Sequence, residues 1–509
     1  MTSLTPESAT PGSPTTTDAD IVSVRSALRS PRRLRTEVLA GLVVGLALIP
    51  EAISFSIIAG VDPRVGLFAS FTMAVSIAFL GGRPAMISAA TGAVALVIAP
   101  VMRDHGFDYL IATVLLAGIL QVVLGVLGVA RLMRFIPRSV MVGFVNSLAI
   151  LIFMAQLPHL IDVPWPVYPL VAGGLVVMVL LPRYTRVVPA PLIAILLVTA
   201  VVVPSAISVP TVGDEGELPD SLPSLFWPDV PLSLETLRII GPYALGMAIV
   251  GLLESLMTAK LVDDVTDTPS HKTREAWGQG AANMITGLFG GMGGCAMIGQ
   301  TMINVKASGA RTRISTFLAG VFLLILVVGL GDLVGAIPMA ALVAVMIMVS
   351  VGTLDWHSIR PRTLRRMPRS ETLVMLSTVV VVVLTHNLAI GVVVGVLVAM
   401  VLFARRVAHF TTVDEVAHPD DDTKVYAVTG ELFFASSNDL VNQFDYRNDP
   451  ATVVIDLSGS HIWDASTVVT LDAISTKYER YGTTVEIVGL NPASAERRAR
   501  ISGTLTPTS

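Results

Sequence analysis

Residues 290–304 read GGMGGCAMIGQTMIN, a glycine-rich stretch that lies between two apolar segments of the chain. Glycine at this density disfavours a continuous helix, so we expect a break here, with a helix restarting near Gly299. The first turn of a restarted helix has free N–H groups and the positive end of the helix dipole, which together attract an anion. Because the flanking segments are apolar, the break is expected at membrane depth, inside protein or beside a cavity.

An earlier stretch repeats this pattern. Residues 81–91 read GGRPAMISAAT, with the same order of paired glycines, Ala-Met-Ile, small residues and a threonine. The apolar run that follows, 93–99, is too short to span a membrane alone. Interrupted hydrophobic segments at corresponding places in two halves of a chain indicate a transporter binding site. The alternative is an ordinary glycine-rich loop between two spans, and the second copy weakens it.

The composition is that of a polytopic membrane protein. Of 509 residues, 53% are hydrophobic and 14% are charged, whereas a soluble protein has about 25% charged residues. The net charge of −4 gives no indication of a nucleic-acid partner. A single cysteine, Cys295, excludes an internal disulfide and a cysteine zinc cluster. The sequence has no recognisable set of catalytic residues, so we expect no enzyme activity. We also expect no cofactor, apart from Na+ as an ion whose transport is coupled to that of the substrate.

Fourteen apolar segments are expected to cross the membrane, if 91–102 and 299–308 count as half-helices. Lys and Arg concentrate in the loops after even-numbered segments, and the insert 210–231 is acidic, which places both termini in the cytoplasm. Seven segments per half predict two inverted repeats, about 38–207 and 238–404, in a transmembrane domain over 31–408. The segments are 38–58, 64–80, 91–102, 108–130, 138–157, 166–181, 189–207, 238–263, 275–290, 299–308, 312–330, 334–353, 371–386 and 388–404.

The two ends of the chain differ from this middle part. Residues 1–30 lack the pattern of a signal peptide and are rich in Thr, Ser and Pro, which predicts a disordered cytoplasmic tail. From 410 to 495, strand patterns at 425–429, 451–456 and 483–488 alternate with a helix at 464–481 capped by Asp464. This order predicts a small α/β domain, followed by a tail over 496–509.

Two acids lie within predicted spans, where ionisable side chains are costly and usually functional. Glu51 follows Pro50, which bends or breaks the helix beside the acid. Glu254 lies four residues before Thr258, so both side chains share one helix face. A carboxylate and a hydroxyl together could hold Na+, and a carboxylate alone could carry a proton. The alternative for each acid is a structural group satisfied by hydroxyls or backbone at a helix interface.

Other polar residues are expected to be structural. Asp263 lies near the membrane edge and is expected to be solvated, and Glu275 is expected to interact with the dipole of its own helix. Asn146 and Asn283 are expected to bond between helices. Cys295 is expected to be a small packing residue.

Three stretches resemble one known family. Residues 274–313, REAWGQGAANMITGLFGGMGGCAMIGQTMINVKASGARTR, and 45–70, GLALIPEAISFSIIAGVDPRVGLFAS, resemble spans of the SulP family. This family comprises sulfate-permease-like anion transporters, bacterial relatives of the animal exchangers that include pendrin and prestin. Residues 424–440, KVYAVTGELFFASSNDL, and 453–467, VVIDLSGSHIWDAST, resemble a STAS domain, the usual cytoplasmic tail of the family. The resemblance extends over about residues 30–490.

The resemblance implies a fold, a location and a site. The fold has fourteen spans in two inverted repeats, usually forms a homodimer, and lies here in the cytoplasmic membrane of a bacterium. Glu51 and Glu254 match positions linked to cation or proton coupling, and Thr258 matches a neighbour of a sodium site. The anion is held between the tips of the third and tenth spans, which correspond to Thr91, Gly92, Ala93, Gly299, Gln300 and Thr301.

The tip of the tenth span departs from many relatives, which have Ser-Arg-Ser where this chain has Gly299-Gln300-Thr301. Without the arginine, the anion site depends on helix dipoles and N–H groups. An anion there would benefit from Na+ or H+ at Glu254. This favours symport over exchange, and bicarbonate over the doubly charged sulfate.

In the STAS-like domain, Asp464-Ala465-Ser466 resembles a segment phosphorylated in anti-sigma-factor antagonists. Ser466 is therefore a candidate for regulatory phosphorylation, which a helix N-terminus would tolerate. The alternative is a plain residue of the first helical turn. The domain is also the part of the chain where a cytoplasmic protein partner is expected.

The predicted function is a secondary active transporter of a small inorganic anion in the lipid bilayer, working by cation- or proton-coupled symport with alternating access. Two alternatives share the fold, a dicarboxylate carrier and a nucleobase–cation symporter, although the STAS-like domain argues against nucleobases. A third alternative is a membrane scaffold that acts through its STAS-like domain and transports nothing.

Overall fold

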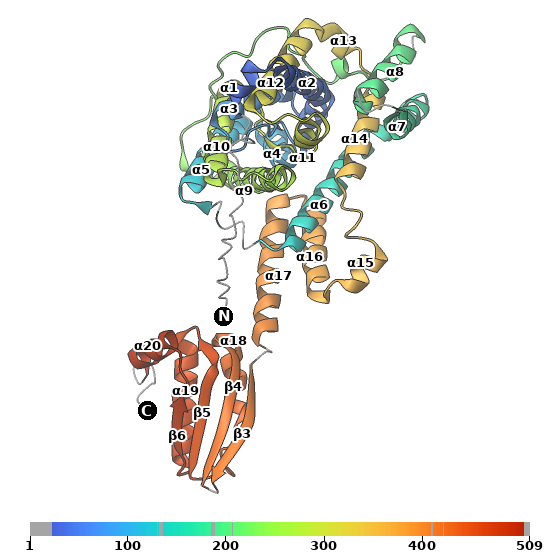
Figure 1. The fold of residues 1–509 in the computed structure, drawn as a ribbon. Coiled ribbons are helices and arrows are strands. Elements are labelled where there is room, and N and C mark those ends of the chain that lie inside the picture. Colours follow the sequence, from blue (N-terminus) through green and yellow to red (C-terminus); the bar gives the residue numbers. More distant parts are fainter. Residues whose placement is uncertain are drawn as a thin grey trace, which may run out of the picture. The chain divides into compact units, whose positions relative to one another are not determined.

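The computed structural model describes residues 23–502, apart from 130, 132–135, 185–188, 206, 409–410 and 421. The predicted tails therefore lie outside the described residues over 1–22 and 503–509. The chain divides into a helical unit, residues 1–368 with 375–394, and a C-terminal unit, residues 369–374 with 395–509 (Figure 1).

Every one of the fourteen predicted segments contains a helix. In the first half these are α2 (Pro31–Ala59), α3 (Pro63–Leu80), α4 (Gly92–His105), α5 (Phe107–Val126), α6 (Arg138–Gln156), α7 (Val167–Tyr184) and α8 (Ala190–Ser205). In the second half they are α9 (Leu234–Thr266), α10 (Lys272–Leu288), α11 (Ile298–Met302), α12 (Arg313–Gly329), α14 (Met339–Thr353), α16 (Arg369–Thr385) and α17 (Leu388–Ala408). Between and before these segments, the described part of the chain also has the short α-helices α1 (Val24–Arg29), α13 (Gly331–Gly335) and α15 (Pro361–Arg366).

Length and composition allow seven helices in the described residues to cross a membrane, and α8, α12 and α14 are shorter apolar helices. The polytopic helical class is confirmed, and the count of fourteen crossings remains a prediction.

Local sequence explains where these helices begin and end. Helix α2 begins with Pro31, whose missing N–H costs nothing in a first turn, and ends at Gly60 with φ of 75°. Helix α9 begins after Ser233, whose hydroxyl accepts from the N–H of Thr236 at 3.1 Å. Helix α12 begins after Thr312, and the carboxylate of Glu37 accepts from the Thr312 N–H at 3.0 Å.

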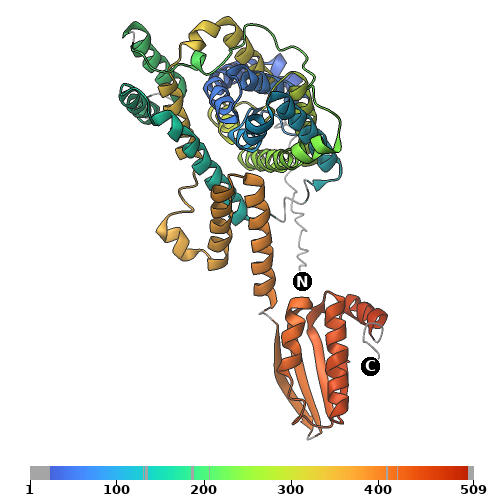
Figure 2. The same cartoon turned by 180° about the vertical axis from the view of Figure 1, so that it is seen from behind.

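Helices of the helical unit fall into two groups. Helices α4 and α11 lie among α2, α3, α5, α9, α10 and α12, and helices α6, α7, α8 and α14 pack on one another beside them (Figures 1 and 2). The first group therefore surrounds the two helices that follow the sequence breaks.

The two breaks meet as a small sheet. Strand β1 (Ser88–Ala89) pairs antiparallel with β2 (Cys295–Ala296), so that Ala89 lies opposite Cys295. Helix α4 begins three residues after Ala89, the last residue of β1. Helix α11 begins two residues after Ala296, the last residue of β2, and continues into a π-helix over Ile303–Ala307. Both predicted breaks are present, and their pairing was not predicted.

The C-terminal unit is a four-stranded sheet with helices, which confirms the predicted α/β class. Its strands are β3 (Thr412–Asp420), β4 (Thr423–Leu432), β5 (Thr452–Ile462) and β6 (Thr484–Val488), in the order β3-β4-β5-β6. The first pair is antiparallel and the other two are parallel. Its helices are α18 (Phe434–Leu440), α19 (Ala465–Arg480) and α20 (Pro492–Ile501) (Figure 1). Strand β3 was not predicted.

Helix α19 begins as the sequence predicts. The side chain of Asp464 accepts from the N–H of Thr467 at 3.1 Å, so Asp464 is the N-cap. Ser466 is exposed in the first turn of the helix. Its phosphorylation remains a prediction.

Candidate functional site

The start of α4 contains three of the residues predicted to bind the anion. Thr91 is buried, and its hydroxyl accepts from the N–H of Val94 at 3.4 Å as the N-cap of the helix. Gly92 and Ala93 form the first turn, where N–H groups have no partner within the helix. A Cβ at Gly92 would lie 2.8 Å from the Phe55 ring, so glycine is needed for the close approach of α2.

The start of α11 contains the other three. Gly299 is exposed, and a Cβ on it would meet no heavy atom of the described chain within 4 Å, so this turn faces open space. Gln300 is buried in the next position. The Thr301 hydroxyl accepts from the N–H of Ile87 at 3.0 Å, so it ties the second broken segment to the first. The β1–β2 pairing therefore brings both helix starts into one region.

Glu254 contacts the second broken segment through Cys295. The thiol of Cys295 donates to Oε2 of Glu254 at 3.0 Å, and the sulfur lies 3.1 Å from the hydroxyl of Thr91. All three residues are buried. Cys295 is a small, fully buried residue, as expected, and its side chain in addition joins the α9 carboxylate to the N-cap of α4. A strand of two residues is too short to have a periodic sequence pattern, so this contact could not be predicted.

Glu51 contacts the same segment through Gln300. Nε2 of Gln300 donates to Oε1 of Glu51 at 2.7 Å. Glu254 therefore contacts the chain just before the start of α11, at Cys295, and Glu51 contacts it just after that start, at Gln300. Sequence spacing could not show this, since the acids lie on helices of opposite halves.

Thr258 lies one turn beyond Glu254, as predicted. Its hydroxyl donates to the main-chain carbonyl of Glu254 at 2.7 Å, which leaves its oxygen lone pairs able to accept a cation. Carboxylate and hydroxyl oxygens are the donors that hard cations prefer, and Na+ binding at these two residues remains a prediction. Among the described residues, no group of three or more His, Cys, Asp or Glu side chains could hold a metal ion.

Asn283 forms a hydrogen bond between helices, as predicted, and Asn146 bonds to a turn. The N–H of Gly294 donates to Oδ1 of Asn283 at 2.8 Å, and Nδ2 of Asn283 donates to Oε1 of Gln121 at 2.8 Å. In the second helix group, Nδ2 of Asn146 donates to the hydroxyl of Ser358 at 2.9 Å. Each asparagine therefore joins its helix to another part of the chain, and Asn283 fixes the strand that contains Cys295.

Glu275 differs from expectation. Its carboxylate accepts from the N–H groups of Gly82 at 2.7 Å and Arg83 at 3.0 Å, so it stabilises the first broken segment instead of its own helix. Glu275 is fully buried. The next turn of α10 adds Gln279, which donates to the hydroxyl of Ser88 at 2.7 Å. One half of the chain therefore supports the broken segment of the other half.

Removing this carboxylate should destabilise the protein. Glu275→Leu leaves two buried N–H groups without an acceptor, at a cost of about 1–3 kcal/mol each. We expect a clear drop in the melting temperature of the purified protein, and a smaller drop for Glu275→Gln, which keeps one acceptor oxygen. A Glu275→Leu protein that melts with the wild type would show that the carboxylate does not hold the segment.

Asp263 is not solvated, contrary to expectation. It accepts from Nη1 of Arg83 at 3.1 Å and from Nζ of Lys272 at 2.6 Å, and its side chain is 18% exposed. The reason is that Arg83, next to the paired glycines of the first break, is almost fully buried and requires a partner. The acid therefore helps to place the chain that leads into β1.

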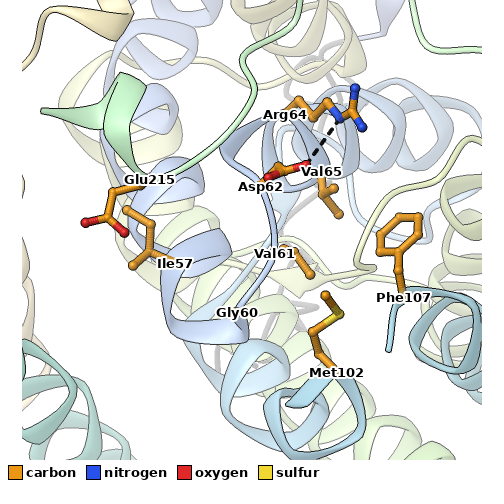
Figure 3. A pocket seen from close by; sticks show the side chains of 9 residues that line it. All are labelled: Ile57, Gly60, Val61, Asp62, Arg64, Val65, Met102, Phe107 and Glu215. Carbon is orange, nitrogen blue, oxygen red and sulfur yellow. Dashed lines mark ion pairs between the residues drawn. The ribbon is translucent and has the colours of Figure 1, made fainter. Parts of the chain in front are cut away.

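A cavity of about 470 Å3 lies away from these residues, at the turn between α2 and α3. Its wall includes Ile57, Met102 at the end of α4, and Phe107 at the start of α5 (Figure 3). Arg64 at its edge pairs with Asp62 at 3.7 Å (Figure 3). None of the predicted anion-binding residues lines this cavity.

Comparisons with known proteins agree with this architecture. Residues 34–169 and 164–378 match the sulfate permease family, and residues 415–505 match the STAS domain. A putative sulfate transporter of Bacillus subtilis, YbaR, is 53% identical over 462 residues, which cover 91% of this chain and 95% of that protein. The bicarbonate transporter BicA of a Picosynechococcus species is 25% identical over 486 residues, covering 84% and 83%.

Two solved structures show the same fold. The transmembrane domain of a cyanobacterial bicarbonate transporter BicA has a TM-score of 0.62 and 24% identity, and covers 72% of this chain and 97% of its own. The murine Slc26a9 anion transporter in the inward-facing state has a TM-score of 0.77 and 17% identity, and covers 92% and 87%. The resemblance seen in the sequence is thus confirmed: the chain belongs to the sulfate permease family, whose members are transporters and not enzymes, and it ends in a STAS domain.

Proposed function

We propose that the chain is a secondary active transporter that carries a small oxyanion, of the bicarbonate or sulfate class, together with Na+ or a proton. One observation carries this proposal. The starts of α4 and α11 are brought together by β1 and β2, and both membrane acids, Glu51 and Glu254, contact the second broken segment. The anion at the helix starts and the cation at the acids would therefore bind close to the same short segment, residues 295–300.

Charge balance favours symport at such a site. Neither helix start has Lys or Arg in its first turn, so an anion there would depend on N–H groups and two helix dipoles. A cation near Glu254 would neutralise the carboxylate and remove its repulsion of the anion. Within the membrane, where the dielectric constant is low, this removal counts for more than it does in water.

The two helix groups supply a basis for alternating access. The group around α4 and α11 would move as one body against the group of α6, α7, α8 and α14. We further propose that the protein lies in the cytoplasmic membrane of a bacterium as a homodimer, with both termini and the STAS domain in the cytoplasm. The names of the relatives support the substrate class, since YbaR is described as a putative sulfate transporter and BicA as a bicarbonate transporter.

Uptake into proteoliposomes tests the proposal. Labelled bicarbonate and labelled sulfate are each offered with no gradient, with an inward Na+ gradient, and with an inward proton gradient. The proposal expects one gradient to accelerate uptake of one of the two anions. Uptake of a labelled dicarboxylate, with no uptake of bicarbonate or sulfate, would show that the substrates are dicarboxylates. Absence of any flux would favour a scaffold that acts through the STAS domain.

A further inference from the structure

Residues 207–233, called the strap below, lead from α8 in one helix group to α9 in the other. The first part of the strap is fixed to the start of α14. The N–H of Val212 donates to the carbonyl of Ile337 at 2.9 Å. The N–H of Met339 donates to the carbonyl of Pro210 at 2.8 Å. The strap therefore begins as part of the group of α6, α7, α8 and α14.

Side-chain bonds make this first part rigid. Oδ2 of Asp214 accepts from both the N–H and the hydroxyl of Thr211, each at 2.8 Å, and closes a 3₁₀ turn over Val212–Asp214. Gly213 lies close to α13, since a Cβ on it would be 3.3 Å from the carbonyl oxygen of Gly335. We therefore expect residues 210–214 to move as one piece with the start of α14.

Three residues further on, the strap contacts the other helix group. The N–H of Arg64, in the first turn of α3, donates to the carbonyl of Glu217 at 3.1 Å. The guanidinium of Arg64 also forms an ion pair with the carboxylate of Glu217. Gly216 has φ of 144°, and a Cβ on it would clash with Oδ1 of Asp62, so the close approach requires glycine. The strap thus joins the two groups at the turn between α2 and α3.

The next stretch of the strap, residues 218–225, is held more loosely. Within it, no main-chain group forms a hydrogen bond with another main-chain group of the described chain. The strap is fixed again at Phe226, whose N–H donates to the carbonyl of Leu288 at the end of α10 at 2.7 Å. Residues 218–225 therefore provide slack that would let Glu217 leave Arg64 while both ends of the strap stay bonded.

We propose that residues 210–217 form a latch, closed in this structure, which holds the two helix groups together at the end of the helical unit where α2 meets α3. This inference rests on the proposed function, because alternating access requires the two groups to separate on each side of the membrane in turn. Opening at this end carries Glu217 away from Arg64. The latch adds to the proposed function a named contact that must break once in every transport cycle.

A covalent bond across the latch tests the inference. An exposed ion pair is weak, so charge substitutions at Arg64 or Glu217 would decide little. Arg64→Cys combined with Glu217→Cys instead places two thiols on main chains that already share a hydrogen bond, within reach of a disulfide. The one native cysteine, Cys295, is buried, so an oxidant should act on the introduced pair.

Uptake of labelled bicarbonate and of labelled sulfate into proteoliposomes is measured for the reduced, the oxidised and the re-reduced protein. Mass spectrometry gives the crosslinked fraction. Because a closed latch would keep the two groups together, we expect uptake to fall in proportion to the crosslinked fraction and to return on reduction.

The matched control is a crosslink within one helix group. Thr211→Cys combined with Pro338→Cys joins an antiparallel pair that two main-chain hydrogen bonds flank, a position where strands approach closely. Oxidation of this pair should leave uptake unchanged. The melting temperature shows whether each reduced protein is folded. If the Arg64 and Glu217 variant is unfolded or does not crosslink, Asp62→Cys with Glu215→Cys and a short bis-methanethiosulfonate reagent replaces it, since both residues border the cavity at the α2–α3 turn (Figure 3).

The outcomes separate the latch from the proposed function. Full uptake by protein crosslinked across the latch would overturn the latch and leave the transporter intact. An equal loss in the crosslinked control would also overturn it, because the effect would not depend on joining the two groups. Failure of either pair to crosslink in folded protein would show that the contact is not made, with the same consequence. No uptake by the wild type would contradict the proposed function itself.

Discussion

Gly294→Ala is expected to abolish transport and to lower the stability of the protein. A Cβ at this position would lie 1.9 Å from the main-chain oxygen of Ala89 and 2.6 Å from its carbonyl carbon. These are backbone atoms of the neighbouring broken segment, so β1 and β2 would have to separate. Overpacking typically costs 1–3 kcal/mol when side chains can adjust, and here none can, so we expect about 3 kcal/mol or more.

The separation also moves one helix start away from the other. A displacement of about 1 Å costs on the order of 100-fold in rate where geometry determines the rate, and we expect a loss of that size in uptake. Gly173→Ala is the matched control, because a Cβ there meets no described atom within 4 Å and the residue lies on α7, outside the predicted anion site. Uptake in proteoliposomes and the melting temperature of the purified protein would be measured for both. Near-normal transport by Gly294→Ala would show that the paired breaks do not form the site.

Glu254→Gln is expected to remove ion dependence without unfolding the protein. Glutamine has nearly the same shape, and its side-chain oxygen can still accept from the thiol of Cys295. It cannot carry a proton or neutralise Na+. If the cation improves anion binding by a typical coupling of 1–3 kcal/mol, the variant should bind the anion roughly 5- to 150-fold more weakly at saturating cation.

The matched control for Glu254→Gln is Asp264→Asn, which removes a carboxylate from an exposed position of the same helix. It should keep the ion dependence of the wild type. Uptake is measured at a series of Na+ concentrations and at a series of pH values for both variants. A Glu254→Gln protein that responds to Na+ and to pH as the wild type does would exclude Glu254 as the coupling group.

Much of the architecture could be predicted because it depends on local sequence. Apolar length and loop charge located all fourteen helical segments, and glycine density located the breaks near Gly92 and Gly299. Asp464 was identified as a helix cap from its position alone. Each of these features is decided within a few residues of the chain.

What could not be predicted depends on pairing across the two halves. The register that places Ala89 opposite Cys295 joins residues about two hundred positions apart, and no periodicity specifies it. The same holds for Glu275, which accepts from the backbone at Gly82, and for Asp263, which pairs with Arg83. In each case the partner is a buried group of the other half of the chain. The sequence alone therefore predicted solvent for Asp263 and the dipole of its own helix for Glu275.

The most direct test of the account measures how anion and cation binding depend on each other in the purified protein. The dissociation constant of the transported anion is determined without the coupling ion and at its saturating concentration. Because Glu254 contacts Cys295 and Cys295 contacts Thr91, we predict anion binding that is at least about 5-fold tighter with the ion, and ion binding tighter by the same factor with the anion. Equal anion affinity with and without either ion, in protein that still transports, would contradict a shared site at the two helix starts.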